Sequence, residues 1–198
     1  MEQLIRNIQN HLQGKQEQLL TLERDEFQCE GWFKAELLTF LHCNGGENNI
    51  QSYEREVKHD SLGRKRIDLK ISVGQDTHWI ELKHWLLGRQ RQNNWTAKGY
   101  FGDQHNGIYN DVSKLSLLPD HNRWLLIFIS RKPTIDEWNA GIKRFNEKFD
   151  PLWISSVIGP INGTERFSCG LLRVEPLKPR GSSTPDQTKS SSTRVFSS

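Results

Sequence analysis

The chain has 198 residues, of which 34% are hydrophobic and 26% charged, and its formal net charge is +3 at pH 7. This length is enough for one domain with its own core, and no apolar run approaches the ~18 residues that a membrane span needs. The small positive charge allows a polyanionic partner without requiring one. The N-terminus lacks the long apolar segment of a signal peptide, and the three cysteines lack metal-binding spacing. We therefore expect reduced thiols and a cytoplasmic protein, or one of the nucleoid or nucleus, with no membrane contact.

Hydrophobic spacing predicts secondary structure along most of the chain. Apolar residues recur at helical spacing over residues 2–25, where Gly14 is a weak point, and over residues 31–42. Alternating or continuous apolar runs predict strands, whereas residues 86–107 are too polar to assign. The expected order is helices 2–25 and 31–42, strands 50–59, 66–73 and 77–85, helix 107–118, strand 123–130, helix 134–149 and strands 152–159 and 167–176.

This order predicts a single α/β domain over residues 1–177. An antiparallel meander of three strands comes first, and a crossover helix then leads into a buried strand, so that helices cover a central mixed β-sheet. Thr134 and Glu137 predict a capping box at the start of helix 134–149. Residues 178–198 are rich in Ser, Thr, Pro and Lys and cannot bury apolar area, so we expect a disordered tail.

The segment RIDLKISVGQDTHWIELKHW, residues 66–85, predicts a β-hairpin that carries two acids and a lysine. Because side chains alternate along a strand, Glu81 and Lys83 share one face of the second strand. A two-residue turn at residues 74–75 pairs Asp68 with Glu81, and a four-residue loop pairs it with Lys83 instead. In both registers the paired side chains share a face of the sheet, whereas a three-residue loop would separate them.

Two carboxylates at that distance repel each other, and both stay ionised at low cost only when a cation lies between them. Mg²⁺ takes one or two carboxylates and keeps several waters, and a nearby lysine can orient or deprotonate one of those waters. A surface hairpin with a cross-strand salt bridge explains the same residues. Three features favour a site: Trp79 and Trp85 flank the acids, charges at mid-sheet are costly, and the preceding helix carries Glu36.

Asp68 followed by Glu81-Leu82-Lys83 resembles the PD-(D/E)XK nuclease superfamily, which includes restriction endonucleases, archaeal Holliday-junction resolvases and many repair nucleases. The resemblance covers roughly residues 30–158 through the element order α–β–β–β–α–β, and it implies a restriction-endonuclease-like core. Ile67 stands where the proline of the family's name would be.

The resemblance also implies roles for these residues. Asp68, Glu81 and the backbone carbonyl of Leu82 would bind Mg²⁺ or Mn²⁺, and Lys83 would position the attacking water. Many members of the family add a glutamate from the first core helix, which Glu36 matches. Glu56, on the first strand, is the alternative extra acid.

Basic residues on both sides of the hairpin suit a rim that contacts nucleic-acid phosphates, although ordinary solvated loops explain them equally well. These residues are Arg64, Lys65, Arg66, Arg89, Arg91, Lys98 and Lys114. The sequence therefore predicts a metal-dependent, endonuclease-like phosphodiesterase that acts on nucleic acid, with DNA favoured over RNA by the family resemblance, as a monomer or a homodimer. Two alternatives stay open: a nuclease-fold module that binds nucleic acid or acts as a scaffold without catalysis, and an α/β domain whose motif is coincidental.

Overall fold

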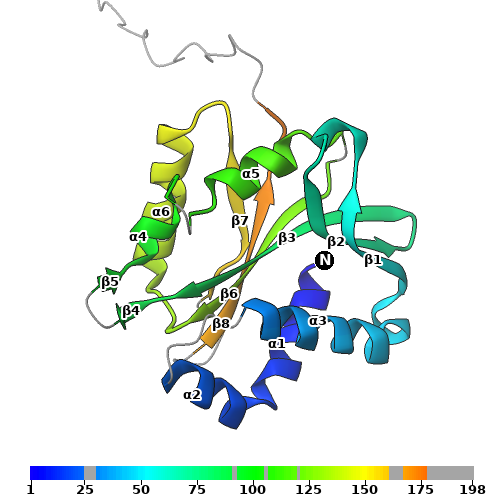
Figure 1. The fold of residues 1–198 in the computed structure, drawn as a ribbon, viewed down its shortest axis with the longest axis horizontal. Coiled ribbons are helices and arrows are strands. Elements are labelled where there is room, and N and C mark those ends of the chain that lie inside the picture. The colour runs from blue at the N-terminus through cyan, green and yellow to red at the C-terminus, as the bar shows by residue number, and fades with distance from the viewer. Residues whose placement is uncertain (25–29, 91–92, 105–106, 120, 161–166, 178–198) are drawn as a thin grey trace, which may run out of the picture.

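The computed structural model describes residues 1–24, 30–90, 93–104, 107–119, 121–160 and 167–177. The tail expected over residues 178–198 therefore lies outside the described part of the chain. Six strands form one mixed sheet in the order β1-β2-β3-β6-β8-β7 (Figure 1). They are β1 (Ile50–Lys58), β2 (Arg66–Val73), β3 (Asp76–Leu86), β6 (Arg123–Ser130), β7 (Ile154–Ile158) and β8 (Phe167–Val174).

Strand directions follow from the connections. β1, β2 and β3 form an antiparallel meander, β6 runs parallel to β3, and β8 is antiparallel to both β6 and β7. The parallel pair requires a crossover, which passes through a short two-stranded sheet and two helices. These elements are β4 (Gly88–Gln90), β5 (Asn93–Trp95), α4 (Ala97–Tyr100) and α5 (Tyr109–Ser116).

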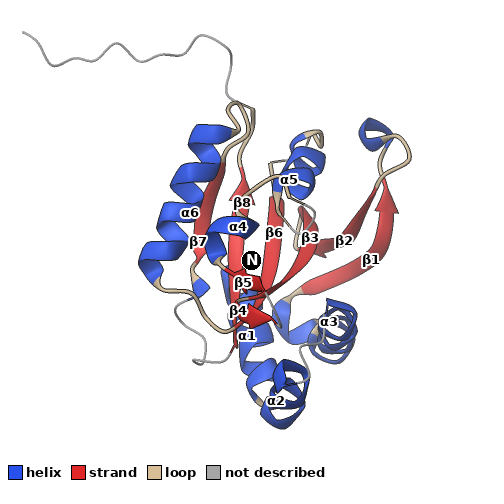
Figure 2. Cartoon of the chain, turned by 60° about the vertical axis from the view of Figure 1, so that its left-hand side comes forward, coloured by secondary structure: helices blue, strands red, loops and turns tan. Residues whose placement is uncertain are grey.

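Helices cover both faces of the six-stranded sheet (Figures 1 and 2). One face packs against α1 (Glu2–Gln13) and α3 (Glu30–Asn44), and the other packs against α4, α5 and α6 (Ile135–Lys148). On β6, Leu126 and Phe128 enter the first core while Leu125 and Ile127 enter the second. This confirms the predicted α/β class and the strand buried on both faces.

Most predicted elements are confirmed with boundaries shifted by a few residues. The helix expected over residues 2–25 is divided at Gly14 into α1 and α2 (Gln16–Arg24), as its weak point suggested. Thr134 caps α6 and forms the predicted capping box with Glu137. Among the described residues, no helix is both long enough and apolar enough to cross a membrane.

Candidate active site

The turn between β2 and β3 decides which side chains face each other. Val73 pairs with Asp76, so the turn has two residues, and its first residue, Gly74, has a φ of 60° that glycine adopts at little cost. This is the first of the two predicted registers, and it sets Asp68 opposite Glu81. The pairing ends at Leu69 and Ile80, so the strands part just before the two acids.

Side-chain hydrogen bonds replace the backbone ladder where β2 and β3 part. The backbone amide of Leu82 donates to a carboxylate oxygen of Asp68 at 2.9 Å, and the amide of Asp68 donates to Glu81 at 3.2 Å. In a strand, the N–H and C=O of one residue point to the same neighbouring strand, so the Leu82 carbonyl also points into this gap. Asp68 and Glu81 are thus adjacent, but the Asp68 carboxylate also contacts Lys34 of α3, whereas the Glu81 carboxylate contacts Lys114 of α5, so the two acids do not share one face as the hairpin predicted.

Side-chain alternation on β2 breaks at Asp68. Ile67 lies in the core beneath α5, whereas Leu69 lies in the core beneath α3, although regular alternation would direct both to one face. The change of face frees Asp68 from both cores. Its carboxylate therefore lies at the gap between the strands and reaches α3, where the Nζ of Lys34 is 2.7 Å away.

A matching irregularity occurs on β1 at Glu56, which lies opposite Asp68 because Arg55 pairs with Leu69 and Val57 pairs with Ile67. The φ of Glu56 is 50°. A left-handed backbone costs a non-glycine residue roughly 1–2 kcal/mol, and such strain is typical of functional sites. The left-handed backbone also brings the Glu56 side chain to the pocket that its strand neighbour Arg55 lines.

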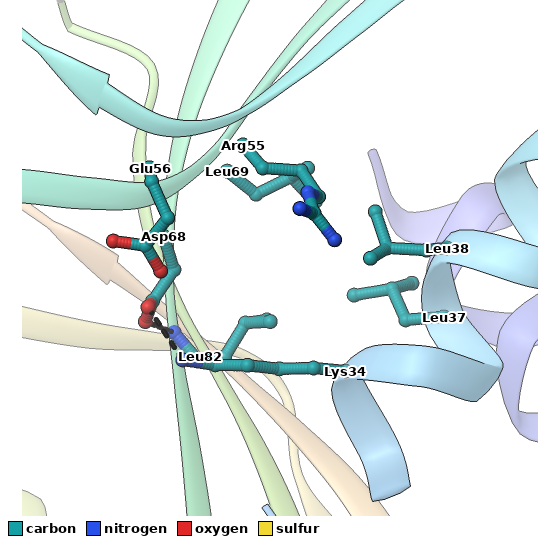
Figure 3. Close-up of a pocket in the computed structure, with 8 residues that line it drawn as sticks. All are labelled: Lys34, Leu37, Leu38, Arg55, Glu56, Asp68, Leu69 and Leu82. Atoms are coloured by element: carbon teal, nitrogen blue, oxygen red, sulfur yellow. Dashed lines mark hydrogen bonds and ion pairs between the residues drawn. The ribbon is translucent and has the colours of Figure 1, made fainter. Parts of the chain in front are cut away.

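A pocket of about 170 Å³ opens beside Asp68 on the face covered by α3 (Figure 3). Lys34 reaches across it from α3 to Asp68, and Glu56 lies on the Asp68 side of the pocket. The residues that line the pocket are Lys34, Leu37, Leu38, Arg55, Glu56, Asp68, Leu69 and Leu82. The pocket thus combines an apolar wall from α3 with charged side chains from β1 and β2.

On the other face of the sheet, α5 contributes two charged side chains that contact β3. The Nζ of Lys114 lies 2.6 Å from the carboxylate of Glu81, and the Nζ of Lys83 lies 3.0 Å from that of Asp111. Lys83 therefore shares the face of Glu81, as alternation predicted, but its ammonium is paired with an acid that the sequence analysis did not identify. The spacing of three residues between Asp111 and Lys114 places both on one helix face and was the available signal.

Burial controls the ionisation of this cluster. Burial raises the pKa of Glu81, whose side chain is only 3% exposed, to about 8, and the charge of Asp68 adds to the rise while Lys114 opposes it. Burial acts to lower the pKa of Lys34, but its hydrogen bond with Asp68 and the charge of that acid outweigh burial, so this pKa is raised. Strongly perturbed acids next to basic partners are frequent at functional sites.

Glu36 does not join the two acids, in contrast to the prediction. Its carboxylate contacts His11 at 3.1 Å and Lys15 at 3.5 Å, on the side of α1, and it does not line the pocket. Two residues along a helix correspond to a rotation of ~200°, so when Lys34 faces Asp68, Glu36 faces away from it. Glu56, the alternative acid, is the one that lines the pocket.

The described basic residues of the predicted phosphate-contacting rim differ in their surroundings. Arg64, Lys65 and Arg66 are exposed where the chain enters β2, and Lys114 contacts Glu81. Lys98 is exposed on α4 and lines a separate polar pocket. The side chains of Arg89 and Arg91 lie outside the described residues.

The donor set suits a hard divalent cation. Mg²⁺ takes oxygen ligands, usually one or two carboxylates together with waters, and Asp68, Glu81 and the Leu82 carbonyl supply such oxygens. Within the described ranges, no group of three or more His, Cys, Asp or Glu side chains is arranged to hold a metal ion.

Comparison of the chain with protein-family models, curated proteins and solved structures found no match. The resemblance to the PD-(D/E)XK superfamily therefore rests on the motif and on the placement of its residues.

Proposed function

We propose that this protein is a metal-dependent phosphodiesterase of the PD-(D/E)XK type that hydrolyses nucleic acid, and DNA rather than RNA by the family resemblance. The observation that carries the proposal is the hydrogen bond from the backbone amide of Asp68 to the almost fully buried carboxylate of Glu81, where β2 and β3 part. The order α3–β1–β2–β3–α5–β6, with β4, β5 and α4 inserted before α5, supports it because it follows the α–β–β–β–α–β order of that superfamily.

Asp68, Glu81 and the Leu82 carbonyl would hold Mg²⁺ or Mn²⁺. Such an ion supplies a Lewis acid and lowers the pKa of bound water. Of the two candidates for an extra acid, Glu56 is the better one because it shares the pocket with Asp68. Lys34 contacts Asp68, and Lys114 contacts Glu81. They would be the counter-charges that a divalent ion displaces.

Lys83 is the best candidate for positioning the attacking water, since it lies on the same face of β3 as Glu81. Its ammonium is 3.0 Å from Asp111, and this ion pair fixes the side chain at one place. Asp111 is accordingly a positioning residue that acts through Lys83. An ammonium held in this way stabilises negative charge that develops during phosphodiester hydrolysis.

A cleavage assay tests the proposal directly. Single-stranded, duplex and branched DNA and RNA are incubated with Mg²⁺ or Mn²⁺ and the wild-type protein, Asp68→Asn or Glu81→Gln. We expect metal-dependent cleavage of at least one substrate, reduced by ~10²-fold or more in both variants. The matched control is Glu54→Gln. Glu54 is an exposed acid of β1 that pairs with Lys70 of β2, and this variant should cleave like the wild type. Cleavage that survives in Asp68→Asn and Glu81→Gln would refute the site.

A non-catalytic module that binds nucleic acid or acts as a scaffold is the second candidate. The observation in its favour is that each acid already has a lysine partner, so the cluster has no need of a metal for charge balance. This candidate predicts binding without cleavage of every substrate, and affinity that does not change when divalent ions are removed.

A further inference from the structure

Arg55 is a basic side chain that lines the pocket beside Asp68. Its guanidinium points into the pocket from β1 (Figure 3), and within the described part of the chain it forms no hydrogen bond or ion pair. Lys34 lies in the same pocket and contacts the acids Asp68 and Glu30. Two cations thus face one small space beside the candidate metal ligands.

We propose that Arg55 and Lys34 form a phosphate-binding subsite, in which a phosphate group of the nucleic acid binds next to the metal held at Asp68. This inference rests on the proposed function and adds residues that select the substrate. The five donors of a guanidinium form a planar fork that matches two phosphate oxygens, and the ammonium of a lysine adds a point charge.

The shape of the pocket suits such a group. Its volume of about 170 Å³ is many times the ~15 Å³ that one water requires, so it has room for a phosphate together with waters. Leu37 and Leu38 of α3 form its apolar wall. An apolar wall lowers the local dielectric and strengthens the attraction between the basic groups and an anion.

The charges of the pocket make anion binding depend on the metal. Its lining contains two basic side chains, Lys34 and Arg55, and two acidic ones, Glu56 and Asp68, so the ionised pocket is neutral overall. A bound divalent ion adds positive charge beside the pocket and so favours an anion there. Because coupling between two ligands is reciprocal, a phosphate should also strengthen metal binding.

The left-handed backbone at Glu56 maintains this arrangement. Regular alternation would direct Arg55 and Glu56 to opposite faces of β1, but both line the pocket. The irregular residue therefore brings an acid for the metal beside an arginine for the phosphate.

The test uses the full chain and a deoxynucleoside 5′-monophosphate as the probe, with Ca²⁺ or with a chelator. Ca²⁺ takes the same oxygen ligands, and nothing in the probe is cleaved. We expect the wild type to bind the monophosphate with Ca²⁺ and at least tenfold more weakly with the chelator. Arg55→Ala should lose tenfold or more in affinity with Ca²⁺, the usual scale for a hydrogen bond to a charged group, and Arg55→Lys should lose less.

The matched control is Arg144→Ala, which removes an exposed arginine from α6, next to the opposite edge of the sheet from β1 (Figure 2). It should bind the probe like the wild type. Equal binding by Arg55→Ala and Arg144→Ala, equal binding with and without Ca²⁺, or no binding by the wild type would overturn the subsite. A failure of the proposed function gives a different result. In that case the wild-type protein still binds the monophosphate through Arg55 but shows no metal-dependent cleavage.

Discussion

The main-chain amide of Leu82 donates a hydrogen bond of 2.9 Å to Asp68 across the gap where β2 and β3 stop pairing. The other carboxylate oxygen of Asp68 accepts from the Nζ of Lys34 at 2.7 Å. One partner is rigid backbone and the other is a side chain that can move. The carboxylate is therefore oriented before any ligand binds, and Lys34 is the partner that a cation would replace.

The buried acid of the cluster predicts how stability depends on pH. The pKa of Glu81 is about 8 in the folded protein against an ordinary value of 4.5, so the folded state holds its proton more tightly than the unfolded state. The contribution of Glu81 to the free energy of unfolding of the metal-free protein should thus be highest below pH 4.5. This contribution should fall by at most ~1.4 kcal/mol per pH unit as the pH rises to about 8. Urea denaturation of the wild type and Glu81→Gln across this range measures the difference, and parallel pH profiles would contradict the assignment.

Metal binding should release a proton from the same carboxyl group. At pH 7 a group with a pKa near 8 is mostly protonated, and a cation binds its ionised form. Calorimetry of Mn²⁺ binding in two buffers of different ionisation enthalpy should show nearly one proton released per ion at pH 7, and less at pH 9. A binding heat that is the same in both buffers at pH 7 would exclude Glu81 as a ligand.

Lys83→Ala separates a catalytic role from a structural one. If Lys83 positions the attacking water, cleavage should fall by ~10²-fold or more while Mn²⁺ affinity persists. Asp111→Asn keeps the ammonium but loosens its position, so its cleavage should fall less. If the pair is only structural, both variants should cleave like the wild type and differ from it only in melting temperature.

The strained backbone at Glu56 predicts opposite effects of one substitution on stability and on metal binding. Glu56→Gly removes the cost of a left-handed backbone, so the free energy of unfolding should stay level or rise by up to about 1 kcal/mol. Glu56→Ala keeps the strain and should show no such gain. Both variants lose the carboxylate and should bind Mn²⁺ more weakly by calorimetry. If both Glu56 variants kept the Mn²⁺ affinity of the wild type and Glu36→Gln lost it, the extra metal-binding acid would be Glu36, as first expected from the sequence.

Two glycines in helices test the packing of the fold. A Cβ at Gly141 of α6 would overlap the ring of Phe101, so Gly141→Ala should destabilise the protein by about 1–3 kcal/mol despite the better helix propensity of alanine. No atom of the described residues lies within 4 Å of the position of a Cβ at Gly31 of α3, so Gly31→Ala should be neutral or stabilise by up to about 1 kcal/mol. Equal unfolding free energies of the two variants would contradict the close contact between Gly141 of α6 and the ring of Phe101.

Hydrophobic periodicity alone predicted the order of the helices and strands outside residues 86–107, and the face that Glu81 and Lys83 share. The segment that it left unassigned contains β4, β5 and α4. Periodicity worked because spacing along one element is a local property, and because the continuous apolar run at residues 123–130 is typical of a strand buried on both faces. The sequence left hairpin loops of two, three and four residues open, and the two-residue turn at Gly74 and Gln75 decided the register.

Tertiary packing decided which side chains surround the two acids. The rotation of α3 about its own axis brings Lys34 rather than Glu36 to Asp68, and that rotation depends on how the helix packs on the sheet. The pairing of α5 with β3 likewise joins residues more than twenty positions apart in sequence. The left-handed backbone at Glu56 has no signature in residue type, since an exposed glutamate in a strand is ordinary. Periodicity describes one element at a time, whereas these contacts depend on the position of each element relative to the others.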